Sequence, residues 1–270
     1  MQKFLVCSPK LLNVNQQRKN NLMNFIAIIP ARYASTRFPG KPLALIEGKT
    51  MIARVYEQVC KAQCFHQVWI ATDDERIENE AKRIGANVQM TSFEHRSGTE
   101  RCAEVACKIQ CSENDVVINI QGDEPFINPQ QIIELTACFD NPDVDIATLL
   151  KKITDEKILH NPNVVKVVKD MHGKALYFSR SPIPFVRNAK PHMLDFYQHI
   201  GIYAYKVPVL QKIVKLPATP LELSEQLEQL RWLEHGFKIH TNVTDIESAV
   251  GIDTPEDLDL VVSLLKNNKL

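Results

Sequence analysis

Three cations lie close together in a loop that follows the first apolar segment of the chain. Arg32, Arg37 and Lys41 fall within the stretch 30–43, which contains no acidic residue. An arginine side chain offers phosphate a bidentate fork, and a lysine adds a point charge. Small and turn-forming residues between them let backbone N–H groups approach the same ligand. We therefore predict that this loop binds a polyanion and is not merely a solvated basic loop.

Two aspartates are candidates for a metal site. Asp123 directly follows an apolar segment in QGDEPF (121–126), and Asp253 precedes a helix start in VGIDTPEDL (250–258). Mg²⁺ prefers a few carboxylates together with phosphate oxygens and water. A turn or a helix start also explains each aspartate alone, so the argument rests on the pair. Two carboxylates, a metal and a cationic loop suit phosphoryl or nucleotidyl transfer, which needs charge neutralisation more than covalent help.

Other polar groups are less informative by themselves. In EHRSGTER (94–101), Ser97 and Glu100 have the spacing of a capping box, although the amides and hydroxyls there can also read a base edge or a phosphate. Further polar and aromatic candidates lie in the second half of the chain, and nothing in their spacing shows that they converge: Arg180, His199, Tyr203, Glu228 and Gln229.

The elements that must position these residues alternate between strand and helix. Apolar segments predict buried strands at 25–30, 67–72, 86–90 and 115–121, each followed by a helical pattern. Thr72 with Glu75 is expected to cap the second helix. The alternation predicts an α/β fold with a mostly parallel sheet and helices on both faces. Ligands of such sheets bind beyond the carboxyl ends of the strands, where the cationic loop and Asp123 lie.

The second half of the chain has a different pattern. Strand-like segments with few helices between them predict an inserted β-rich lobe at about 145–215. The segment 221–236 predicts one amphipathic helix, and a last helix is expected from 255 to about 266. We predict a single domain at 24–270. Residues 1–23 are expected to form a flexible tail without function, and Met23 is a candidate natural start.

Composition excludes several classes of protein. The 270 residues carry 32 Lys and Arg and 32 Asp and Glu, and this zero net charge argues against a nucleic-acid or anionic-membrane partner. No apolar run approaches the roughly 20 residues that span a bilayer. The nine glycines never lie two positions apart, which excludes the dinucleotide-binding fingerprint. Seven cysteines without a C-x-x-C pair argue against a disulfide framework or a structural zinc site.

Seven segments, in order, resemble the motifs of the 3-deoxy-manno-octulosonate cytidylyltransferases: PARYASTRFPGKPL, RSGTER, NIQGDEP, YFSRSPIP, HIGIYAY, LEQLRWLEHG and VGIDTPEDL. The resemblance covers about 24–267. It implies a Rossmann-like nucleotidyltransferase fold and Mg²⁺-dependent transfer of a cytidylyl group from CTP to 3-deoxy-manno-octulosonate (Kdo), with release of pyrophosphate. It also implies a cytoplasmic homodimer that activates Kdo for lipopolysaccharide synthesis, with sugar binding and dimerisation in the 145–215 lobe.

The same resemblance implies roles for individual residues. Arg32, Arg37 and Lys41 would hold the CTP phosphates. Ser97 would contact the cytidine, and Asp123 and Asp253 would bind Mg²⁺ beside the nucleotide. Arg32, Lys41 and the two aspartates would form the catalytic set. The sugar pocket would be lined by Gln121, Arg180, His199, Tyr203, Glu228 and Gln229.

Two alternatives stay open at this point. The first is a CMP-sialic acid synthetase or a related sugar nucleotidyltransferase that shares the cationic loop. The second is a nucleotide-sensing binding module without turnover. The pair Asp123 and Asp253 argues against such a module, because binding alone does not need two acids beside phosphates. A nucleic-acid-binding role is disfavoured because the sequence has no basic stripe.

Overall fold

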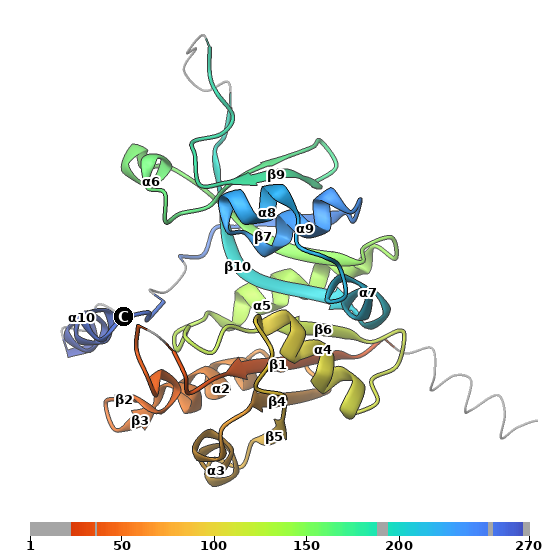
Figure 1. Cartoon of the computed structure of the whole chain (residues 1–270). Coiled ribbons are helices and arrows are strands. Elements are labelled where there is room, and N and C mark those ends of the chain that lie inside the picture. Colours follow the sequence, from red (N-terminus) through yellow and green to blue (C-terminus); the bar gives the residue numbers. More distant parts are fainter. Residues whose placement is uncertain (1–22, 36, 188–193, 248–250, 267–270) are drawn as a thin grey trace, which may run out of the picture.

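The computed structural model describes residues 23–35, 37–187, 194–247 and 251–266 (Figure 1). Of the predicted tail at 1–23, all but Met23 lies outside the described residues. Within the described residues, one sheet contains nine strands: β1 (Phe25–Ala31), β4 (Gln67–Thr72), β5 (Asn87–Met90), β6 (Val116–Asn119), β7 (Ile146–Lys152), β8 (Lys166–Lys169), β9 (Ala175–Ser179), β10 (Tyr197–Lys206) and β11 (Ile239–Thr244). A separate two-stranded ribbon pairs β2 (Leu45–Ile46) with β3 (Lys49–Thr50).

The sheet has the order β11-β7-β10-β6-β1-β4-β5. Its half formed by β6, β1, β4 and β5 is parallel, as predicted. β10 runs antiparallel to both β6 and β7, and β11 is parallel to β7. The chain runs outward from β1 through β4 to β5 and then returns to place β6 on the other side of β1. Between β1 and β6 lies the switch point at which open α/β sheets bind ligands.

Helices cover both faces of this sheet (Figure 1). The helical segments are η1 (Lys41–Leu43), α2 (Met51–Lys61), α3 (Glu75–Arg83), α4 (Gly98–Lys108), α5 (Pro129–Thr136), η2 (Ala137–Asp140), α6 (Glu156–His160), α7 (Val207–Ile213), α8 (Pro220–Glu225), α9 (Glu228–Glu234) and α10 (Pro255–Lys266).

Strand β1 shows how the sheet packs against helices on both of its faces. Its side chains alternate between faces, so Ala27 and Ile29 pack with α2, α3 and α5. Ile26 and Ile28 pack with α4, α7 and α9 on the other face. All four residues are buried, which accounts for the continuous apolar run in the sequence. The prediction of an α/β fold with helices on both faces is confirmed.

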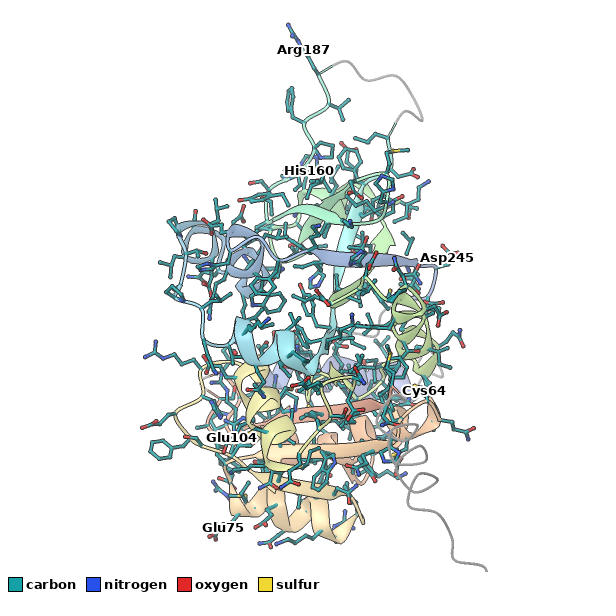
Figure 2. The ribbon with its side chains drawn as sticks, turned by 90° about the vertical axis from the view of Figure 1, so that its right-hand side faces the viewer. Cys64, Glu75, Glu104, His160, Arg187 and Asp245 are labelled. Atoms are coloured by element: carbon teal, nitrogen blue, oxygen red, sulfur yellow. The ribbon has the colours of Figure 1, made fainter. Side chains whose placement is uncertain are left out.

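The β-rich region at 145–215 is built onto the same sheet. Its strands β7 and β10 lie inside the strand order, whereas β8 and β9 extend from β10. The segment that follows β9 projects furthest, and Figure 2 shows Arg187 at one extremity of the molecule and Glu75 near the other. This antiparallel addition is therefore continuous with the central sheet.

Two local predictions were wrong. The segment predicted as one helix over 221–236 forms α8 and α9, because Gln226 adopts a left-handed conformation with φ 53°. This break turns Leu227 and Leu230 into the core. Thr72 does not cap α3, because its side chain is buried at the end of β4. Asp74 caps that helix by accepting a hydrogen bond from the Arg76 N–H.

Two negative findings concern the described residues. None of the helices there combines the length and the apolar character that crossing a bilayer requires. The six cysteines in this part of the chain are free thiols.

Candidate active site

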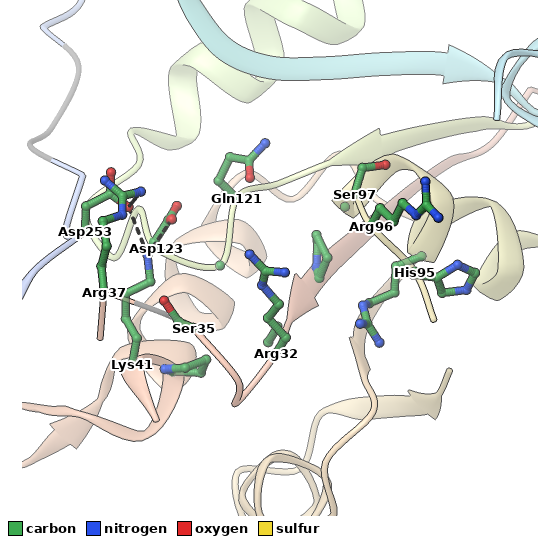
Figure 3. Close-up of a pocket in the computed structure, with 16 residues that line it drawn as sticks. Arg32, Ser35, Arg37, Lys41, His95, Arg96, Ser97, Gln121, Asp123 and Asp253 are labelled. Carbon is green, nitrogen blue, oxygen red and sulfur yellow. Dashed lines mark hydrogen bonds and ion pairs between the residues drawn. The ribbon is translucent and has the colours of Figure 1, made fainter. Parts of the chain in front are cut away.

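A cleft of about 230 Å³ opens beyond the carboxyl ends of β1 and β6 (Figure 3). Four chain segments that are distant in sequence meet there: the loop after β1, the start of α4, the loop after β6 and the approach to α10. The polar side chains that line it are Arg32, Ser35, Arg37, Lys41, His95, Arg96, Ser97, Arg101, Gln121, Asp123 and Asp253. The seven predicted residues Arg32, Arg37, Lys41, Ser97, Gln121, Asp123 and Asp253 are thus brought together.

Lys41 holds the two predicted metal ligands side by side. Its Nζ atom lies 2.7 Å from Oδ2 of Asp123 and 3.2 Å from Oδ1 of Asp253. These partners are 82 and 212 positions away along the chain. Arg37 adds a second cation 3.2 Å from Oδ1 of Asp253. The predicted convergence of the aspartates with the cationic loop is therefore confirmed as a matter of geometry.

The cationic loop is closed by backbone hydrogen bonds. The carbonyl of Tyr33 accepts from the N–H groups of Ser35 and Gly40, both at 2.9 Å. Gly40 has φ 73°, a conformation that favours glycine, and an added Cβ would lie 3.0 Å from the Tyr33 ring. The guanidinium of Arg76 stacks 3.3 Å from the centre of that ring. This packing fixes the loop that carries Arg37 and Lys41.

Close packing on Pro30 positions the other two loops. A Cβ on Gly122 would lie 2.6 Å from the carbonyl oxygen of Pro30, so only glycine fits there. A Cβ on Gly98 would lie 3.0 Å from Cγ of the same proline. The start of α4 and the loop that carries Asp123 therefore both lie directly against the end of β1.

Asp253 lies in the segment before α10, and hydrogen bonds hold this segment beside the loop after β6. The Ile252 N–H donates to the carbonyl of Asp123 at 3.0 Å, which ties this segment to the loop after β6. The carboxylate of Asp257 accepts from the N–H groups of Asp253 and Thr254, both at 2.9 Å. These backbone hydrogen bonds, the one from Asp253 first, hold the pKa of Asp257 below its usual range. The last helix, predicted from 255 to about 266, is confirmed as α10.

The far side of the cleft is formed by the segment between β5 and α4. Ser97 caps α4 by accepting from the Glu100 N–H at 3.2 Å, as predicted. Sequence reasoning missed its neighbours His95 and Arg96, which also line the cleft. It also missed Arg101, whose guanidinium is buried and pairs with Asp73 at 2.9 Å. The sequence could have indicated these residues, because His95, Arg96 and Arg101 are all basic and lie within the motif at 94–101.

A buried carboxylate beside Asp123 was also missed. Burial, followed by the negative charge of Asp123, raises the pKa of Glu124 to about 7. This side chain approaches β10, where its Oε1 lies 3.9 Å from the position of a Cβ on Gly201. Gln121 reaches the same place, since its Nε2 donates to the Gly201 carbonyl at 3.3 Å. The loop after β6 is therefore tied to β10 where the pairing of β10 with β7 shifts register.

Two residues predicted for the sugar pocket are held away from the cleft. Arg180 donates from Nε to the Glu225 carbonyl at 2.8 Å and from its terminal nitrogen to the Pro162 carbonyl at 3.1 Å. The His199 ring lies between Phe178 and Tyr203, and burial lowers its pKa to about 3. Neither side chain lines the cleft in this structure.

Of the other three sugar-pocket candidates, one reaches a second cavity of about 680 Å³. Glu228 lines this cavity, which shares Arg96 and Ser97 with the cleft. Tyr203 and Gln229 are buried and line neither space. Of the six sugar-pocket candidates, the structure thus places only Gln121 in the cleft and Glu228 in the adjoining cavity.

The donor set of the cleft fits Mg²⁺. Asp123 and Asp253 present carboxylate oxygens to one point, which Lys41 contacts. The described residues contain no group of three or more His, Cys, Asp or Glu side chains that could hold a metal ion. Mg²⁺ that binds with a nucleotide needs only one or two carboxylates, because phosphate and water complete its shell.

An open α/β sheet with cations and paired carboxylates at its switch point suits nucleotidyl transfer, and the comparisons with known proteins assign the chain to the nucleotidyltransferases. The family model described as Cytidylyltransferase matches residues 26–239, and the chain belongs to this family. Among its relatives is the 3-deoxy-manno-octulosonate cytidylyltransferase of Bacteroides thetaiotaomicron, 54% identical over 91% of this chain and 99% of the relative. The enzyme of that name from Geobacter sulfurreducens is 47% identical over 90% of this chain and 100% of its own length.

Solved structures agree with this assignment. A CMP:2-keto-3-deoxy-manno-octonic acid synthetase complexed with CTP has a TM-score of 0.85 and 41% identity, covering 91% of this chain and 99% of that one. A 4-diphosphocytidyl-2C-methyl-D-erythritol synthase has a TM-score of 0.61 at 13% identity, covering 90% of this chain and 99% of its own. At that identity the second likeness concerns the fold alone.

Proposed function

We propose that the protein transfers the cytidylyl group of CTP to Kdo, giving CMP-Kdo and pyrophosphate. The observation that carries this proposal is the meeting of Lys41, Asp123 and Asp253 beside Arg37 at the switch point of the sheet. The substrates are those in the names of the similar enzymes from Bacteroides thetaiotaomicron and Geobacter sulfurreducens. The complex of a similar enzyme with CTP supports CTP as the nucleotide.

The reaction joins two anions, so charge neutralisation is the main task of the site. The anomeric hydroxyl oxygen of Kdo forms a bond to the α-phosphorus of CTP, and its proton leaves to solvent. The bond from that phosphorus to the β-phosphate oxygen breaks, and pyrophosphate departs with the electron pair. Arg32, Arg37 and Lys41 would hold the phosphates, reduce repulsion from the Kdo carboxylate and stabilise charge on the leaving group.

Asp123 and Asp253 would hold Mg²⁺ next to these phosphates. When bound there, the ion supplies further positive charge to the phosphate oxygens. Lys41, which contacts both carboxylates, keeps them at a common point. Ser97 would face the cytidine from the start of α4.

The sugar acid would bind toward β10 and α9. The six residues proposed for its pocket are Gln121, Arg180, His199, Tyr203, Glu228 and Gln229. Because Gln121 borders the cleft and Glu228 borders the adjoining cavity, we place the sugar next to Ser97, where the two spaces meet. Engagement of Arg180 and His199 would then require the second half of the sheet to move toward the cleft.

We also propose that the protein acts in the cytoplasm as a homodimer and supplies activated Kdo for lipopolysaccharide. The similarity to enzymes named for Kdo supports this role. For dimerisation, the candidate region is the extension formed by β8, β9 and the segment after them.

Pyrophosphate release tests the proposed activity directly. The purified protein is incubated with CTP, Kdo and MgCl₂, and each component is omitted in turn. We expect pyrophosphate only when all three are present, and a much lower rate when N-acetylneuraminate replaces Kdo. Preference for N-acetylneuraminate would assign the protein to the sialic acid synthetases. Binding of CTP without pyrophosphate release would indicate a nucleotide-sensing module.

The variant Asp123→Asn tests the metal assignment in the same assay. We expect Mg²⁺-dependent turnover to fall by roughly 10²–10³-fold, by analogy with the loss of one transition-state contact, while the circular dichroism spectrum stays unchanged. Asp143→Asn removes an exposed aspartate that does not line the cleft and serves as the control. Near-normal turnover of Asp123→Asn would show that this carboxylate does not hold the metal.

A further inference from the structure

A buried threonine hydroxyl at the start of α4 is hydrogen-bonded to a glutamate at the start of α9. The hydroxyl of Thr99 donates to Oε2 of Glu228 at 2.7 Å, across 129 positions of sequence. Thr99 is 3% exposed. Its hydroxyl is not the helix cap, because Ser97 accepts the capping hydrogen bond of α4. The side chain of Thr99 is therefore devoted to a tertiary contact.

The hydrogen bond from Thr99 affects the protonation of the Glu228 carboxyl group. Burial raises the pKa of Glu228, and hydrogen bonds from Thr99 and then from Ser97 oppose that effect. A buried carboxylate that loses a donor either keeps an unpaired charge or takes up a proton. The Thr99 hydroxyl, donating at 2.7 Å, is therefore one of two groups at the start of α4 that favour the charged form of Glu228 and hold its carboxylate in place.

Thr99 and Glu228 lie where the nucleotide cleft and the second cavity adjoin. Ser97, two residues before Thr99, borders both the nucleotide cleft and the second cavity, and Glu228 borders the second cavity. The Tyr203 and Tyr205 side chains lie near Glu228. Burial raises the pKa values of both tyrosines well above the usual range, and the negative charge of Glu228 adds to this effect. The Thr99 hydroxyl therefore links the nucleotide side of the site to the proposed sugar side.

We propose that Thr99 is a positioning residue for the sugar acid, because its hydroxyl holds the Glu228 carboxylate beside Ser97. This inference rests on the proposed cytidylyl transfer to Kdo and adds a residue that does not itself touch the substrate. Loss of the hydroxyl is expected to weaken Kdo binding while CTP binding is retained, because Thr99 does not line the nucleotide cleft.

The decisive variants change one functional group at a time. Thr99→Val removes the hydroxyl at nearly constant volume, and Thr99→Ser keeps it. Thr136→Val is the matched control, because Thr136 is also buried and its hydroxyl donates only to the Ile133 carbonyl within α5. If valine prevents folding, Thr99→Ala removes the hydroxyl without added bulk and makes the same comparison.

Steady-state pyrophosphate release is measured with Kdo and CTP varied separately. For Thr99→Val we expect the KM for Kdo to rise roughly tenfold to a hundredfold, the range for a lost hydrogen bond to a charged group. The KM for CTP should stay within about twofold of wild type. Thr99→Ser should restore the KM for Kdo, and Thr136→Val should behave as wild type.

Three outcomes would overturn the inference while leaving the proposed function intact. One is an unchanged KM for Kdo in folded Thr99→Val. Another is an equal rise in KM for Kdo and CTP. The third is failure of Thr99→Ser to restore Kdo binding. If the wild-type protein itself releases no pyrophosphate, the proposed function fails, so the two failures are distinguishable.

Discussion

Glu104 shows how one carboxylate anchors a loop of the active site. It accepts hydrogen bonds from the Ser92 N–H at 2.9 Å and from the His95 ring, and its other oxygen pairs with Lys108 at 2.7 Å. Burial alone would raise the pKa of Glu104, but hydrogen bonds from Lys108, the Ser92 N–H and His95 lower it to about 2. The segment that brings His95 into the cleft is thus fastened to α4.

The lowered pKa predicts a pH-dependent contribution to stability. A carboxyl group whose pKa falls on folding, here from 4.5 to about 2, stabilises the protein above about pH 4.5 and loses this effect as the pH falls toward about 2. Glu104→Gln should therefore lower the free energy of unfolding at neutral pH by roughly 1–2 kcal/mol, less than the full shift because solvent screens this partly exposed carboxylate. That difference should shrink below about pH 4.5 and nearly vanish near pH 2.

Urea unfolding of wild type and variant over this pH range measures the difference. Glu113→Gln, which changes an exposed carboxylate, should show no such pH dependence. A Glu104→Gln deficit that stays constant from neutral pH to about pH 2 would contradict the assignment, because it would arise from packing and not from charge.

Site residues could be predicted from sequence where a strand end placed them. Asp123 directly follows a buried strand, so its position at the carboxyl edge of the sheet followed from the strand pattern alone. Glu124 was missed because its burial depends on β10, which approaches it at Gly201, far along the chain. The orientations of Arg180 and His199 also depend on tertiary partners, Glu225 and Thr148, that no local pattern reveals.

At the scale of elements, close packing of two loops positions the metal candidates. Gly122→Ala would place a methyl group 2.6 Å from the Pro30 carbonyl, so the loop that carries Gln121 and Asp123 must shift. We expect turnover to fall by roughly 10²-fold, because misplacement of reacting groups by about 1 Å has that effect. The thermal unfolding midpoint should fall by only a few degrees, since a small local shift costs little of the total stability.

Gly251→Ala provides the control, because Gly251 also lies close in sequence to a candidate metal ligand, Asp253, but nothing lies within 4 Å of a Cβ at Gly251. This variant should keep most of its activity. Wild-type turnover by Gly122→Ala would mean that the loop tolerates the shift and that its close approach to β1 is not required.

Strands were more predictable than helix ends. The parallel strands could be predicted from continuous apolar runs, because a strand that is buried on both faces needs apolar residues at every position. The break between α8 and α9 could not be predicted, because Gln226 is not a residue that normally marks a left-handed position and the apolar spacing continues through it. The cap of α3 was misplaced by two residues, because Thr72 and Asp74 both have capping side chains and only the burial of Thr72 separates them.

At the scale of the whole molecule, three strongly exposed apolar side chains lie on β9 and in the segments on either side of it. Met171 is 96% exposed, Leu176 61% and Phe185 89%. Soluble monomers rarely expose such side chains together, and contiguous patches of this kind mark interaction surfaces. We therefore predict that this region forms the dimer interface.

Analytical ultracentrifugation tests this interface. The wild type should sediment as a dimer, and Leu176→Glu should shift it to monomer because a buried unpaired charge destabilises the contact. Leu45→Glu, at a leucine with the same 61% exposure on β2, should remain dimeric. A monomeric wild type, or a dimeric Leu176→Glu variant, would place the interface elsewhere or remove it.

Helix α10, which follows Asp253, is attached to the molecule separately from the helices that cover the central sheet. This helix packs through a small cluster of its own, in which Ile252 and Val261 meet Ile46 and Met51, and Figure 1 shows it at one side of the molecule. Detachment of so few contacts requires less energy than melting the central sheet. Mild warming would then withdraw Asp253 and inactivate the enzyme reversibly, well before the rest of the chain unfolds.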